Sequence, residues 1–275
     1  MNYVKLNIEL NELHPWRDIL IYELGEVLFE SFEDTENGLH AYVPEKEFNE
    51  DNILAIEKKF QEHISKLEVE FIQAQNWNAN WEANFDPVLV GKQLMIKAPF
   101  HDADDSFDYV IEIQPKMSFG TGHHETTRLI STFLLNETSI PEVVLDMGCG
   151  TGVLTILAEK LGAKSLTGID IEDWAYENSI ENAERNDCKN IKFLHGGIEQ
   201  IPNQDFGLIL ANINKNILLQ QMDTFYNRMI DGAKLILSGF YQSDVQDLVT
   251  FGEKLGFTYV KEENIQSWAM LVLKK

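Results

Sequence analysis

The pattern of apolar and polar positions divides the chain into two parts. In the first part, alternation over 3–10 predicts a half-buried strand, and apolar residues at helical spacing over 15–29 predict a helix. The next predicted elements are strands at 31–35 and 38–44 that form a hairpin, a helix at 52–64 and a strand at 67–74. This order, strand-helix-strand-strand-helix-strand, predicts a small ferredoxin-like α+β domain over residues 1–74.

The second part repeats a strand followed by a helix, which predicts an α/β fold with a doubly wound, Rossmann-like parallel sheet. We expect strands at 93–98, 109–114, 143–147, 165–171, 191–195, 206–213 and 232–239, and helices at 152–162, 173–187, 214–230 and 243–255. Two last strands, at 257–265 and 268–273, have no helix between them and should form a C-terminal antiparallel hairpin. This domain is predicted to cover residues 89–275.

Residues 75–88 separate the two parts and are rich in Asn and Trp. They are predicted to form an interdomain linker that is partly helical. Trp77 and Trp81 are four residues apart, so they should share one helix face and pack onto a domain.

Composition restricts the class of protein. The sequence of 275 residues is 44% hydrophobic, which is enough for a sizeable core, and Cys149 and Cys188 are its only cysteines. Two distant cysteines favour a reducing compartment over a disulfide framework. No apolar run approaches the ~20 residues that span a bilayer, and the N-terminus is too polar for a signal peptide. A cytoplasmic protein without membrane attachment is therefore expected.

The formal net charge is −23. Phosphates would be repelled by such a surface, so direct binding of nucleic acid is not expected. Residues 1–75 alone contain 17 acidic and 6 basic residues. This excess would attract a basic partner, and solubility alone is the alternative explanation.

The strongest local motif is the segment 143–152, in which an apolar strand runs into the turn Asp146-Met147-Gly148-Cys149-Gly150-Thr151-Gly152 and then a helix. Glycines allow a ligand to approach the backbone closely, and the helix N-terminus offers N–H groups to an anion. The glycine spacing differs from a dinucleotide fingerprint, and no lysine completes a Walker loop. Asp146 suits a ligand with positive charge, such as S-adenosylmethionine. A tight turn without a ligand is the alternative.

Two further polar residues end predicted strands of the same sheet. Asp170 stands 22 residues beyond Gly148, where a carboxylate can accept both hydroxyls of a ribose. Asn212 ends the fourth strand, which lies beside the first in a doubly wound sheet. Its carboxamide oxygen can accept a hydrogen bond from a substrate amine. Either residue could instead cap the helix that follows it.

The segment 119–127, Phe-Gly-Thr-Gly-His-His-Glu-Thr-Thr, precedes this core. Its two glycines favour a mobile loop that covers the cofactor. His123 and His124 are adjacent, which is poor spacing for two metal ligands on one helix face, so no metal site is expected.

At these motifs the chain closely resembles the PrmA family, whose members methylate the large-subunit ribosomal protein L11. The segments that carry the resemblance are 115–127, 146–152, 168–171, 211–213 and 237–239. Residues 110–275 resemble the family well, and the N-terminal domain resembles it in architecture only. Lys116 and Asn214 depart from the usual family residues, glycine and an apolar residue respectively.

The resemblance implies that S-adenosylmethionine is bound by Thr127, Gly148, Asp170 and Asn212. It implies repeated methyl transfer to amine nitrogens, either lysine side chains or the N-terminal amine, of ribosomal protein L11. The N-terminal domain would grip this basic substrate, and the enzyme is expected to act as a monomer. No general base stands out, and bulk water or a loop residue such as His123 could accept the proton.

Three alternatives remain open at this point. An NAD-dependent dehydrogenase is disfavoured by the glycine spacing and by the C-terminal hairpin. A glutamine-side-chain methyltransferase usually has Asn-Pro-Pro-Tyr where this chain has Asn212-Ile213-Asn214-Lys215. A non-catalytic module that keeps the cofactor pocket is the third.

Overall fold

The computed structural model describes residues 2–72, 85–116 and 120–275. The chain divides into two compact units, residues 1–84 and residues 85–275. The prediction of a helix with Trp77 and Trp81 on one face falls outside the described residues. Phe85, which the prediction assigned to the linker, packs its ring against Phe100 and His123 of the second unit.

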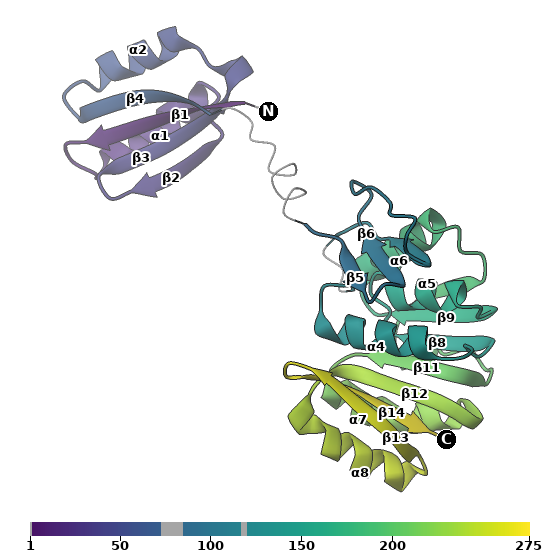
Figure 1. Cartoon of the computed structure of the whole chain (residues 1–275). Helices are drawn as coiled ribbons and strands as arrows, with labels where there is room; N and C mark the ends of the chain where they lie inside the picture. The colour runs from purple at the N-terminus through teal and green to yellow at the C-terminus, as the bar shows by residue number, and fades with distance from the viewer. Residues whose placement is uncertain (1, 73–84, 117–119) are drawn as a thin grey trace. The chain divides into compact units, whose positions relative to one another are not determined.

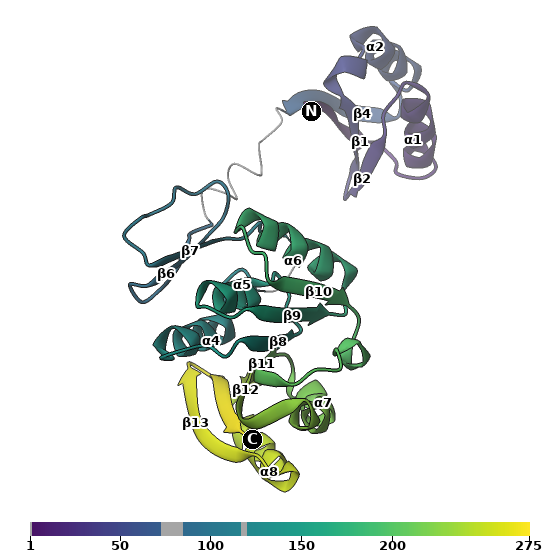
Figure 2. The ribbon, with the colours of Figure 1, turned by 90° about the vertical axis from the view of Figure 1, so that its right-hand side faces the viewer.

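The first unit is a four-stranded antiparallel sheet with two helices on one face (Figures 1 and 2). Its elements are β1 (Tyr3–Leu10), α1 (Trp16–Glu26), β2 (Ser31–Thr35), β3 (Gly38–Pro44), a 3₁₀ turn (Glu45–Glu47), α2 (Glu50–Lys59) and β4 (Ile64–Ile72). The strands lie in the order β2-β3-β1-β4. In β1, Val4, Leu6 and Ile8 are buried against helix residues such as Leu20 and Ile53, as the alternation predicted.

Both bounds of the second helix of this unit were predicted wrongly. The helix expected at 52–64 begins earlier, because the Asn49 side chain caps it by accepting a hydrogen bond from the Asp51 N–H at 2.9 Å. It also ends earlier, at Lys59, and Ile64 already belongs to β4, where it pairs with Leu10. Ile64 continues the apolar spacing of the helix by coincidence, since its side chain contributes to the core from the sheet.

The second unit is built on a seven-stranded sheet in the order β10-β9-β8-β11-β12-β14-β13. Its strands are β8 (Val143–Met147), β9 (Ser165–Asp170), β10 (Ile191–His195), β11 (Phe206–Asn212), β12 (Met229–Tyr241), β13 (Thr258–Ile265) and β14 (Trp268–Lys274). The first five strands are parallel, and β14 is antiparallel to both neighbours. The predicted α/β fold, parallel sheet and C-terminal hairpin are therefore confirmed.

Helices cover both faces of this sheet (Figure 2). They are α4 (Glu125–Asn136), α5 (Val153–Lys160), α6 (Asp173–Arg185), α7 (Lys215–Asn227) and α8 (Val245–Leu255). The helices α4, α5 and α6 contribute to one apolar cluster, and α7 and α8 contribute to the other. The order of strands reverses between β8 and β11, so the carboxyl ends of these two strands form the crevice where doubly wound folds bind ligands.

A smaller three-stranded sheet precedes the main one and consists of β5 (Val88–Val90), β6 (Leu94–Lys97) and β7 (Tyr109–Glu112). The prediction missed β5 and assigned Val88 to the linker. It also missed α4, because the buried face of this helix carries Thr126, Thr127 and Ser131 among its apolar residues. Buried polar residues obscured the helical period.

No helix among the described residues is both long and apolar enough to cross a membrane.

Candidate functional site

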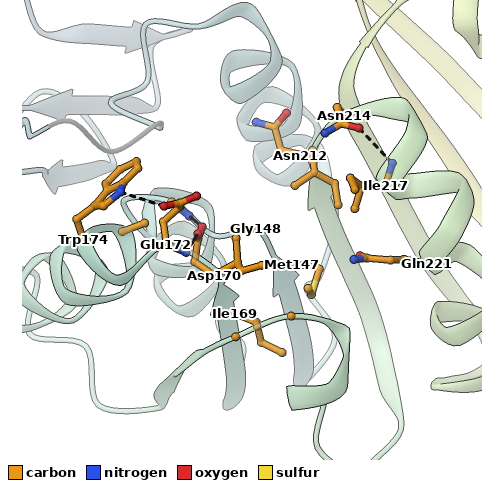
Figure 3. A pocket seen from close by; sticks show the side chains of 16 residues that line it. Met147, Gly148, Ile169, Asp170, Glu172, Trp174, Asn212, Asn214, Ile217 and Gln221 are labelled. Carbon is orange, nitrogen blue, oxygen red and sulfur yellow. Dashed lines mark hydrogen bonds between the residues drawn. The ribbon is translucent and has the colours of Figure 1, made fainter.

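A pocket of about 370 Å³ opens at the carboxyl ends of β8, β9 and β11 (Figure 3). Its size falls within the range of small-molecule sites. The lining consists of Met147, Gly148, Gly150, Ile169, Asp170, Ile171, Glu172, Trp174, Ala175, Gly196, Gly197, Asn212, Ile213, Asn214, Ile217 and Gln221. Three of the four residues that the sequence indicated, Gly148, Asp170 and Asn212, meet there.

The glycine turn forms one wall of the pocket. Gly148, Gly150 and Gly152 have φ angles of 74°, 56° and 79°, a region that favours glycine. A Cβ on Gly148 would lie 2.3 Å from Ile213 Cγ2, so a larger residue would force Ile213 to shift. The N–H groups of Gly148 and Cys149 donate to the Ile169 carbonyl at 2.8 and 3.0 Å. These bonds fix the turn against the end of β9.

Asp170 ends β9 and is 9% exposed. Its Oδ2 accepts a hydrogen bond from the Gly150 N–H at 2.8 Å, and its Oδ1 accepts one from the Glu172 N–H at 3.1 Å. It does not cap α6, since Glu172 occupies that position without a side-chain bond. Each carboxylate oxygen accepts about two hydrogen bonds, so both retain capacity for a ligand hydroxyl.

Asp146 does not line the pocket, although the sequence suggested it would face a positively charged ligand. Its side chain is 1% exposed, and its Oδ2 accepts a hydrogen bond from the Thr155 hydroxyl at 2.6 Å. Its pKa is raised to about 7, mainly by burial and in part by the nearby charge of Asp170, against the opposing effect of the hydrogen bond from Thr155. Its hydrogen bond joins the end of β8 to α5, the two elements that flank the glycine turn.

This burial makes stability depend on pH. Because the pKa of Asp146 is higher in the folded state than in the unfolded state, the folded state keeps this proton up to a higher pH. The contribution of Asp146 to the free energy of unfolding therefore falls from about pH 4 and is lost above about pH 7. Asp146→Asn lacks this charge, so the variant should melt higher than the natural protein at pH 8 by roughly 2–10 °C, and the gap should shrink towards pH 4.5. Calorimetry at the two pH values measures it, with exposed Asp205→Asn as the control. A gap independent of pH would contradict the assignment.

Asn212 ends β11 and places its side chain in the pocket (Figure 3). Its Oδ1 is buried and has no hydrogen-bond partner among the described residues. Helix capping does not explain it, because Asn214 caps α7 by accepting a hydrogen bond from the Ile217 N–H at 3.1 Å. Because Asn214 caps the helix, Asn212 is available for a ligand.

Thr127 does not line this pocket. It lies in the first turn of α4, is 1% exposed, and its Oγ1 has no hydrogen-bond partner among the described residues. Phe119 of the predicted loop lies outside the described residues. The loop is tied to the glycine turn at Gly120, whose carbonyl accepts a hydrogen bond from the Thr151 hydroxyl at 2.6 Å.

The two adjacent histidines have separate structural partners. The His123 ring nitrogens lie 3.0 Å from the Asp86 carbonyl oxygen and 3.2 Å from Thr121 Oγ1. His124 caps α4 and packs against the Trp268 ring, with 4.6 Å between the ring centroids. Among the described residues, no group of three or more His, Cys, Asp or Glu side chains is placed to hold a metal ion.

Sequence reasoning missed seven residues of the lining: Glu172, Trp174, Ala175, Gly196, Gly197, Ile217 and Gln221. The first three lie within five residues after Asp170, and the two glycines follow the end of β10. Ile217 and Gln221 are four residues apart in the helix predicted at 214–230, so they share one face. That spacing, in the helix after the fourth strand, was the available signal.

The reversal of strand order, the glycine turn, the acidic residue at the end of β9 and the C-terminal hairpin together define a Rossmann-like methyltransferase. A methyltransferase from Pyrococcus furiosus shares the fold, with a TM-score of 0.50 and 19% identity over 60% of this chain and 88% of that one. The chain belongs to the family described as ribosomal protein L11 methyltransferase (PrmA), whose model matches residues 8–275.

Individual relatives agree with the family match. The "Ribosomal protein L11 methyltransferase" of Porphyromonas gingivalis is 40% identical over 98% of this chain and 97% of its own length. That of Chlorobaculum tepidum is 34% identical over 97% and 94%. A crystal structure of ribosomal protein L11 methylase from Lactobacillus delbrueckii subsp. bulgaricus has a TM-score of 0.65 and 26% identity, and covers 70% of this chain and 99% of that one.

Membership of this family confirms the recognition made from the motifs and the expectation of S-adenosylmethionine as cofactor. It also decides against an NAD-dependent dehydrogenase.

Proposed function

We propose that this protein transfers methyl groups from S-adenosylmethionine to amine nitrogens of ribosomal protein L11, on lysine side chains or the N-terminal amine. The observation that carries the proposal is the buried, unpartnered Asn212 Oδ1 beside the glycine turn. A buried acceptor that lacks a donor, placed at the pocket wall, suits a donor N–H on the substrate. We place the reaction in the cytoplasm, where ribosomal proteins are made, and expect a monomer.

The pocket fits the cofactor. Gly148 allows the cofactor to approach the backbone closely, and Asp170 retains lone pairs for the two ribose hydroxyls. The apolar part of the lining suits the adenine ring. Asn212 and Thr127, each with an unpartnered buried oxygen, are the other two proposed contacts. When bound, S-adenosylmethionine supplies an electrophilic methyl group on a sulfonium, so no covalent enzyme intermediate is required.

The protein's contribution is positioning and exclusion of water. Asn212 would accept an N–H of the substrate amine and thereby direct the nitrogen lone pair towards the methyl group. A lysine amine has a pKa near 10.4 and must lose a proton before it attacks. His123 does not line the pocket, and both of its nitrogens have neighbours, so we assign proton removal to water.

The first unit supports a role in recognition of the substrate. Its strand order, and the two helices that connect β1 to β2 and β3 to β4, are those of a split βαβ unit. This arrangement supports the ferredoxin-like assignment. The sheet face opposite the helices, which we call the open face, carries alternate residues of each strand. Its acidic members are Glu9, Glu33, Glu68 and Glu70, and its basic members are Lys5 and Lys66. This surplus of acid suits a basic ribosomal protein.

Asn212→Ala is expected to lower kcat for methylation of L11 about tenfold. Because Asn212 is also one of the four proposed cofactor contacts, the variant should bind S-adenosylhomocysteine more weakly, but by a smaller factor. The loss of one hydrogen bond to the amine corresponds to about 1.4 kcal/mol. Rapid-quench kinetics with radiolabelled cofactor measure the chemical step. The matched control is Asn216→Ala, an exposed asparagine four residues further on, in the first turn of α7. A variant with unchanged kcat would remove Asn212 from the mechanism.

The proposed function is tested with ribosomal proteins from a strain that lacks this enzyme. Incubation with the protein and isotopically labelled S-adenosylmethionine, followed by mass spectrometry of intact proteins and peptides, identifies the acceptor and its atoms. We expect the label on amine nitrogens of L11. Label on glutamine side chains, or on a different protein, would refute the proposal, and complete absence of label would favour the non-catalytic alternative.

A further inference from the structure

Gln221 of α7 brings a buried carboxamide to the pocket that none of the roles above uses. Its Oε1 is closed to solvent and has no hydrogen-bond partner among the described residues. Figure 3 shows the side chain reaching towards the pocket near Met147, on the side opposite Asp170. A buried acceptor without a donor is costly, which indicates that a ligand supplies the donor.

The other polar side chains of the pocket are already engaged or assigned. Asp170 accepts two amide N–H groups, Glu172 accepts the Trp174 indole N–H at 3.2 Å, and Asn214 caps α7. Asn212 also has a free oxygen, and it is assigned to the substrate amine. Gln221 is therefore the remaining carboxamide that can select a polar edge of the cofactor.

The surroundings of Gln221 indicate which part of the cofactor this is. Met147, Ile169 and Ile217 line the same region, so the ligand part there is flat or apolar with a polar edge. If Asp170 holds the ribose, the attached base is the part that can enter this region. Adenine presents an amino donor beside a ring-nitrogen acceptor, and a glutamine carboxamide matches that pair with its own acceptor and donor.

We propose that Gln221 recognises the adenine of S-adenosylmethionine through its 6-amino group and the adjacent ring nitrogen. The inference rests on the proposed function, since it requires this cofactor in this pocket. It makes Gln221 a specificity residue for the base, in a position separate from the methyl group and the substrate amine.

The test is calorimetric titration with S-adenosylhomocysteine and with its 6-desamino analogue, which lacks only the amino group. The natural protein should bind the analogue about tenfold more weakly, as expected for loss of one base-edge contact. Gln221→Met keeps the length of the side chain without its polar atoms. This variant should bind S-adenosylhomocysteine about tenfold more weakly than the natural protein and should bind the two ligands within about twofold of each other.

Gln220→Met is the matched control, because Gln220 is the same residue type, adjacent in the helix and exposed. It should retain the tenfold preference. A preference that survives in Gln221→Met would overturn the inference, as would equal binding of both ligands by the natural protein. If the methionine variant unfolds, Gln221→Leu provides the same comparison. Failure of the natural protein to bind S-adenosylhomocysteine would instead refute the proposed function, so the two failures are distinguishable.

Discussion

Asp170→Ala is expected to weaken the binding of S-adenosylhomocysteine about 100-fold, because the substitution removes two contributions at once. The first is the charged acceptor for the ribose hydroxyls, where hydrogen bonds to a charged group are worth roughly 1.5–3 kcal/mol. The second is the pair of bonds from the Gly150 and Glu172 N–H groups, which hold the glycine turn and the segment after β9 in place.

Asp170→Asn separates these two contributions. The amide keeps one oxygen acceptor but loses the charge, so an intermediate loss of about tenfold is expected. Calorimetric titration gives both dissociation constants, and circular dichroism checks that the variants fold. Asp173→Ala, three residues further on and exposed, is the control and should bind normally. Unchanged affinity in a folded Asp170→Ala variant would remove the ribose assignment.

The sequence predicted the main sheet well because its strands are apolar runs that end in turn residues. The strands at 143–147 and 191–195 have the predicted bounds, and the C-terminal hairpin is present. In contrast, α4 escaped prediction because three hydroxyl residues interrupt its apolar face. Those residues are buried by tertiary packing, which local periodicity does not report.

The candidate site was predictable where a residue ends a strand. Gly148, Asp170 and Asn212 come together because the carboxyl ends of β8, β9 and β11 are neighbours in the sheet. Gln221 lies two turns into α7, so its position depends on how that helix packs. Asp146 was misplaced for a related reason: alternation along β8 directs its side chain away from the pocket, towards Thr155 of α5.

Removal of the first unit is expected to produce the largest loss of activity. A protein consisting of residues 85–275 contains both apolar clusters of the second unit and the whole pocket. It should therefore bind S-adenosylhomocysteine as the full chain does. Its kcat/KM for intact L11 should fall at least about 100-fold, because a tethered recognition unit raises the effective concentration of substrate at the active site. Equal kcat/KM values for the truncated and full-length proteins would refute the role in recognition.

Charge on the open face should account for part of this loss. Glu68 and Glu70 lie in β4 next to Asn7 and Lys5, are exposed, and would meet a basic partner directly. Changing both to Lys should raise KM for L11 about tenfold at low salt, and less at 0.5 M salt, where exposed charges are screened over shorter distances. The matched control changes the exposed residues Glu57 and Glu62 to Lys, which alters the net charge equally away from the open face. If both double substitutions raise KM equally, the net charge steers the substrate and the open face has no special role. If neither raises KM, the first unit recognises the substrate through contacts other than charge.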